Sequence, residues 1–145
     1  MSARRFHATH TQQTNARPEQ IWALWSDVDN WPDWDLGLEA CRLDGPFAAG
    51  NRFTLRPRGS GQDITAELQV VVPNRRFSDA TVLPFGTLQA LHEIDSDSGS
   101  TKVTHTIIAE IAEEHADFFA NSIWKNVEHG LKGSVAKLTA LAETS

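Results

Sequence analysis

Three histidines are the residues of this chain best suited to chemistry. His10, His92 and His105 each lie in a segment where apolar and polar residues alternate, on the side that carries the apolar residues. Because imidazole titrates near neutral pH, His92 and His105 are candidates for acid–base catalysis or for polarising a ligand carbonyl. One short turn joins their two segments, so the two side chains could be neighbours across a hairpin.

Other catalytic or metal-binding motifs do not stand out. None of the six histidines shows a metal-ligand spacing such as His-x₃-His, so we expect no metal and no cofactor. Cys41 is the single cysteine, which excludes an internal disulfide and a cysteine cluster. The sequence contains no clear phosphate-binding glycine loop, Ser-His-Asp arrangement or Cys-His pair.

Tryptophan is concentrated near the N-terminus, where four of the five fall within residues 22–34. A short helix with so much aromatic surface must pack against something large, and a curved sheet with room for a guest is the simplest partner. This indicates a small-molecule pocket. The candidate ligand-binding residues are two polar residues of the first strand and the large apolar residues expected around the pocket: His10, Gln12, Trp25, Trp31, Trp34, Phe53, Phe77, Phe85, Phe119, Ile123, Trp124 and Val127.

Period-two alternation predicts the strands that position these residues. They are Arg5–Thr14, Leu38–Leu43, Asn51–Pro57, Asp63–Val72, Arg76–Val82, Phe85–Asp95 and Lys102–Ile111.

Helices are predicted at both ends of this strand-rich region. Pro18 suits the first turn of a helix, residues 27–30 are typical of a turn, and Pro32 would begin a second short helix or an irregular turn. Apolar residues recur every four positions from Phe119, which predicts one long amphipathic C-terminal helix. Gly130 and Gly133 within it would mark a bend or a close approach to the sheet.

This order of elements indicates an α+β fold in one domain over residues 1–145. The long helix should cover the concave side of the sheet. A single helix cannot fill a strongly curved seven-stranded sheet, so the remaining space holds either large side chains or a ligand.

Composition limits the class of partner. The net charge of −6 and the scarcity of adjacent basic residues argue against nucleic acid. We expect no membrane span because no run of 18 apolar residues exists, and a cytoplasmic location because no signal peptide is visible. A homodimer is compatible with the sequence, although no motif supports it.

Several motifs together resemble the polyketide cyclase/dehydrase-like branch of the START-related superfamily. These motifs are Ala16-x-Pro18-Glu19-x-Ile21-Trp22, Asp27, Pro32-x-Trp34, Gly45, Gly50, the turn at residues 72–77, and Gly99-x-Thr101-Lys102-Val103-Thr104. The resemblance implies a helix-grip fold, in which a seven-stranded sheet wraps round a C-terminal helix with a deep pocket between them. It also implies a hydrophobic ligand such as a lipid, sterol or polyketide. The chain departs from the pattern at Arg17, where a second proline is common, and it has no tyrosine.

Three functions follow as hypotheses. The first is binding of a small hydrophobic, cyclic or lipid-like molecule in the cavity between sheet and helix. The second is a cyclase, aromatase or dehydratase that acts on a polyketide-like substrate, with His92 or His105 as the acid–base group. The third is a non-catalytic interaction module with a closed core.

Overall fold

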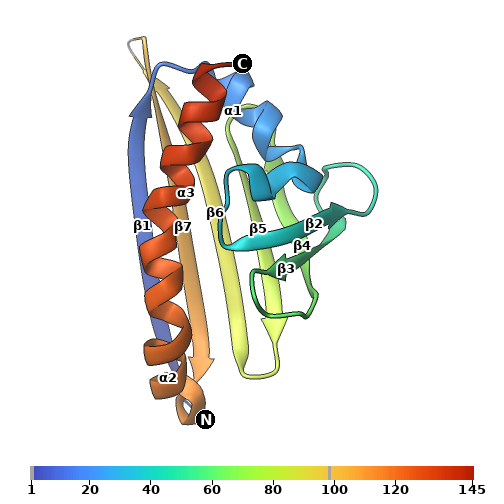
Figure 1. Ribbon diagram of the computed structural model, residues 1–145, viewed down its shortest axis with the longest axis vertical. Coiled ribbons are helices and arrows are strands. Elements are labelled where there is room, and N and C mark those ends of the chain that lie inside the picture. The colour runs from blue at the N-terminus through green and yellow to red at the C-terminus, as the bar shows by residue number, and fades with distance from the viewer. Residues whose placement is uncertain (1, 98) are drawn as a thin grey trace.

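The strands of this protein form one antiparallel sheet in the order β1-β7-β6-β5-β4-β3-β2 (Figure 1). The computed structural model describes residues 2–97 and 99–145, and within them this sheet has seven strands. They are β1 (Ala3–Thr14), β2 (Leu38–Leu43), β3 (Arg52–Pro57), β4 (Ile64–Val72), β5 (Arg76–Leu83), β6 (Gly86–Asp97) and β7 (Ser100–Ala112). Each strand lies within two residues of its predicted bounds, which confirms the α+β class.

The pairing of β1 with β7 is the one connection in the sheet between strands that are distant in sequence. All the other neighbours follow one another along the chain. At the tight turn between β5 and β6, Gly86 passes so close to β7 that an added Cβ atom would lie 2.2 Å from the carbonyl oxygen of Glu110. Only glycine fits this approach.

Two short helices follow β1. The first is α1 (Pro18–Trp25), where Pro18 stands in the first turn and the Gln20 side chain accepts a hydrogen bond from the Arg17 N–H over 2.7 Å. The second is the 3₁₀ helix η1 (Val28–Asp33). The prediction was wrong in detail here, because η1 includes most of the expected turn and Pro32 lies inside the helix rather than at its start.

The C-terminal helix has three consecutive parts, α2 (Glu113–Phe119), the π-helical turn η2 (Ala120–Trp124) and α3 (Lys125–Glu143). It begins before Phe119, where the sequence predicted its start. In Figure 1, α3 runs along β1 and β7, and α1 and η1 lie beside the C-terminal end of α3, over one end of the sheet. Within the described residues, every helix is too short or too polar to cross a bilayer.

The two glycines of α3 do not approach the sheet, although a close approach was one of the two alternatives predicted for them. No atom lies within 4 Å of the place where a Cβ would stand on Gly130 or Gly133, and both are exposed. A double Gly130→Ala and Gly133→Ala variant should therefore gain helix propensity and raise the free energy of unfolding by about 1–2 kcal/mol, measured by urea denaturation. The reverse change at exposed Ala140, Ala140→Gly, should cost about 1 kcal/mol. A double variant less stable than wild type would show that the glycines have another role.

Candidate functional site

The three histidines identified from the sequence form one row across the sheet. His10 on β1 pairs with His105 on β7, and His105 pairs with His92 on β6. The ring centroids of His92 and His105 lie 4.6 Å apart, which confirms that they are neighbours across a hairpin. The row continues on β5 with Phe77, whose ring stacks on His92 at a centroid distance of 3.9 Å.

His92 and His105 are neutral near pH 7 because they are buried. Burial lowers the pKa of His92 to about 3. Burial, reinforced by the nearby His92 and His10, also lowers the pKa of His105 well below its usual value. The Nε1–H of Trp25 donates a hydrogen bond to His105 Nε2 over 3.2 Å, so this nitrogen carries no proton. These rings can take part in hydrogen bonds, but neither titrates near neutral pH.

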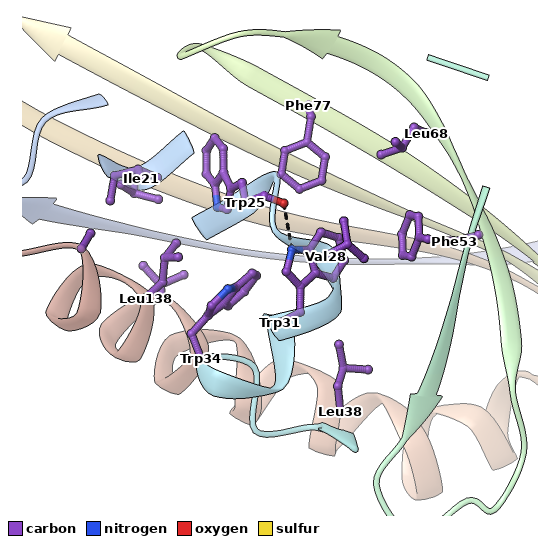
Figure 2. Packing of buried hydrophobic residues seen from close by; sticks show 14 of the residues in the cluster. Ile21, Trp25, Val28, Trp31, Trp34, Leu38, Phe53, Leu68, Phe77 and Leu138 are labelled. Carbon is purple, nitrogen blue, oxygen red and sulfur yellow. Dashed lines mark hydrogen bonds between the residues drawn. The ribbon is translucent and has the colours of Figure 1, made fainter. Parts of the chain in front are cut away.

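Five of the predicted ligand-binding residues pack against one another near α1 and η1 (Figure 2). We call them the tryptophan cluster: Trp25, Trp31, Trp34, Phe53 and Phe77. Each is at most 4% exposed. Ring centroids are 5.1 Å apart for Trp31 and Phe53 and 5.3 Å apart for Trp25 and Phe77. The Trp31 Nε1–H donates to the Trp25 carbonyl oxygen over 2.8 Å. Side chains therefore fill this end of the concave face.

The other five apolar candidates gather around the π-helical turn, and we call them the π-turn cluster. They are Phe85, Phe119, Ile123, Trp124 and Val127, which pack with Phe6. Phe119 and Trp124 are buried, but the other three are only half-buried. A π-helical turn within an α-helix is often found at functional sites.

Gln12 joins the first strand to the helix. Its side-chain amide donates a hydrogen bond to Thr139 Oγ1 on α3 over 2.9 Å. His10, two residues earlier on the same face of β1, is half-buried. Gln12 thus faces α3, and contact of Gln12 or His10 with a ligand stays a prediction.

Asp79 is the interior residue that the sequence analysis missed. It lies on the concave face of β5, and its register partners are Leu68 on β4 and Ala90 on β6. The residue is 7% exposed and makes no hydrogen bond or ion pair with any of the described residues. Burial alone raises the pKa of its carboxyl to about 7.

A signal for Asp79 was present in the alternation of β5. Phe77, Asp79 and Thr81 share the buried face, while Val82 on the other face is 81% exposed. A carboxylate on the apolar side of an alternating strand is costly unless it is paired, so it often marks a functional site.

Asp35 is a second acidic group that is partly buried. Asp35 accepts hydrogen bonds from Ser134 Oγ on α3 and from the Gly37 N–H, and burial raises its pKa. Burial raises the pKa of the Cys41 thiol to about 12, with smaller contributions from the charges of Asp35, Asp29 and Asp79. That thiol is unreactive at neutral pH. Within the described residues, no group of three or more His, Cys, Asp or Glu could hold a metal ion.

Two hollows open among the described residues, and neither lies under the C-terminal helix. One, of about 140 Å³, opens beside the bulge in β4, and its lining includes Val70 together with the predicted site residues Phe77 and His92. The other, of about 200 Å³, lies along β2 and β3 and includes Ala40, Thr54 and Asp63. Neither is lined by α3, so the deep cavity between sheet and helix stays a prediction.

The sequence matches one protein family over nearly its whole length. A sequence model of the family described as polyketide cyclase / dehydrase and lipid transport matches residues 5–143. No curated protein matches the sequence.

Solved structures share the fold at low sequence identity. Protein SA2116 of Staphylococcus aureus, described as of unknown function, is 11% identical with a TM-score of 0.76, over 98% of this chain and 96% of that one. TTHA0849 of Thermus thermophilus is 13% identical with a TM-score of 0.76, over 96% and 98%. A truncated norcoclaurine synthase of Thalictrum flavum is 12% identical with a TM-score of 0.72, over 95% of each chain.

Proposed function

This chain belongs to the polyketide cyclase/dehydrase and lipid-transport family, and from that premise we propose that it binds a small, mostly apolar molecule between the sheet and the π-turn cluster. The observation that carries the proposal is the difference in burial between the two ends of the concave face. The side chains of the tryptophan cluster are buried at one end of the concave face. At the other end, five apolar side chains stay half-buried: Leu88, Ala90, Ile107, Ile123 and Val127.

These half-buried residues come from both sides of the expected site. Ala90 on β6 pairs with Ile107 on β7, while Ile123 and Val127 come from the C-terminal helix. Apolar surface that stays in contact with water costs free energy, and a contiguous patch of it often marks a binding site for an apolar ligand. Burial of this surface contributes about 25 cal/mol per Å² of apolar area, which must exceed the cost of the freedom that the ligand loses on binding.

The test uses N-phenyl-1-naphthylamine, an uncharged dye whose fluorescence rises in apolar surroundings. Wild-type protein should give saturable binding. Ala90→Phe places a ring in the proposed site and should weaken binding at least tenfold. The matched control is Ala80→Phe, on the outer face of the adjacent strand β5, and it should bind as wild type does.

Two results would overturn the proposal. One is the absence of saturable binding to wild-type protein, which would favour an interaction module with a closed core. The other is an equal loss of binding in both variants, which would place the dye elsewhere. Circular dichroism of each variant confirms that it folds.

A second candidate function is acid–base chemistry on a polyketide-like substrate. The observation in its favour is Asp79, because a carboxyl with a pKa of about 7 can both give and take a proton at neutral pH. His92 and His105 are less suited, since burial keeps both uncharged there. The reaction rate of the wild-type protein should change with a pKa near 7. Loss of this pH dependence in Asp79→Asn would support this function.

A further inference from the structure

Asp79 is an interior polar residue whose missing hydrogen-bond or ion-pair partner a ligand could supply. The inference below rests on the proposed function. Asp79 stands on β5 between the tryptophan cluster and the half-buried apolar residues of the proposed site. Its neighbour on β6 is Ala90, the small residue that faces this site, so no bulky side chain separates the carboxylate from a guest there.

No protein group neutralises this carboxylate. Asp79 has no hydrogen-bond or ion-pair partner among the described residues, and the buried residues among them include no lysine or arginine. Its oxygens are not among the atoms closed off from solvent, so the carboxylate keeps some contact with water, but the burial of the residue still weakens its hydration. A ligand that supplies the missing positive charge would recover that cost on binding.

The surroundings of Asp79 add to the negative potential. Asp29, Asp35 and Asp79 all act on the thiol of Cys41, which places three carboxyl groups within electrostatic reach of one point on β2. Asp35 is already held by Ser134 and Gly37, and exposed Asp29 accepts a hydrogen bond from the Leu43 N–H over 2.9 Å. Asp79 is therefore the acidic group left to bind a guest directly.

A second interior polar atom also lacks a partner but is enclosed. The Nε1–H of Trp34 has no acceptor among the described residues, and its atom is closed off from solvent. The ring of Trp34 packs against those of Trp31 and His105, at centroid distances of 5.7 Å each. A ligand in the half-buried end meets Asp79 rather than this indole.

We propose that the ligand of this protein is a hydrophobic amine, and that the Asp79 carboxylate binds its protonated nitrogen while the π-turn cluster holds its apolar body. The pairing of one ammonium with one carboxylate satisfies both charges in a site of low polarity. The aromatic rings near Asp79, of which Phe77 is the nearest along β5, favour a cation over an anion.

The test compares three ligands with the same apolar body by titration calorimetry at pH 8. 1-Naphthylmethylamine is protonated, 1-naphthylmethanol is neutral and 1-naphthoic acid is anionic. Wild-type protein should bind the amine at least tenfold more tightly than the alcohol, and the acid more weakly than either. In Asp79→Asn, the preference for the amine over the alcohol should fall to about one, with affinity for the alcohol unchanged.

The matched control is Asp95→Asn, because Asp95 lies exposed on the outer face of β6. This variant removes the same charge and should keep the wild-type preference. Equal affinity of wild-type protein for amine and alcohol, or a preference that survives Asp79→Asn, would overturn the inference and leave the proposed function standing. Failure of every naphthyl compound and of the uncharged dye would overturn the proposed function itself.

Discussion

His105→Ala should lower the free energy of unfolding by about 3 kcal/mol, because it both removes a buried ring and deprives a buried donor of its acceptor. His105 is 4% exposed, and its Nε2 accepts the hydrogen bond of Trp25 Nε1–H. Trp25 is fully buried, so its indole N–H would find no water in exchange. The melting temperature should fall by about 10 °C.

Two further variants separate the hydrogen bond from the packing. His105→Gln keeps an acceptor on the side chain and should recover part of the lost stability. His129→Ala removes an exposed histidine from α3 and should change the free energy of unfolding by less than about 0.5 kcal/mol. Urea denaturation measures all three. If His105→Ala unfolds at the wild-type urea concentration, His105 is not needed for the core and its proposed role with a ligand gains support.

The sheet could be predicted because its alternation is regular. In β7, for example, inward Val103, His105 and Ala109 are buried while Lys102 and Glu110 are exposed. A regular period also fixes register, since a shift by one residue would expose the whole apolar face. The alignment of His92 with His105 followed from this regularity and the short turn between their strands.

The helices were predicted less well, because their ends depend on tertiary packing. Pro32 suggested the start of a helix, but the chain had already turned into η1 at Val28. The C-terminal helix begins at Glu113, ahead of its apolar repeat, and passes through a π-helical turn at residues 120–124. A π turn adds one residue to the helical repeat, and a residue pattern with a period near four does not reveal it.

The sequence could not separate a packed core from a lined pocket. Trp31 and Val127 were predicted to line the same cavity, yet Trp31 is 4% exposed within the tryptophan cluster and Val127 stays half-buried. Both are apolar residues at inward positions, so periodicity treats them alike. The difference arises from η1, which folds over one end of the sheet and leaves the other end to the C-terminal helix alone.

Asp79→Leu should raise the free energy of unfolding, and the gain should be about 4 kcal/mol larger at pH 8 than at pH 4. In the unfolded chain the carboxyl loses its proton near pH 3.8, whereas in the folded protein it keeps the proton to about pH 7. Between these values the folded state binds more protons. The free energy of unfolding of the wild-type protein is therefore highest, as far as Asp79 affects it, at low pH. It falls as the pH rises from about 4 to about 7.

Comparison of the variant with wild type isolates this carboxyl from the buried histidines. The lowered pKa of His92 and of His105 reduces stability as the pH falls below about 6.5, but it does so in both proteins. Urea denaturation at a series of pH values gives the difference directly, and Asp95→Leu on the exposed face of β6 should show none of this pH dependence. A difference between wild type and Asp79→Leu that is constant from pH 4 to pH 8 would mean that water or a protein group already stabilises the Asp79 carboxylate in the folded protein. In that case no amine would be needed to satisfy it.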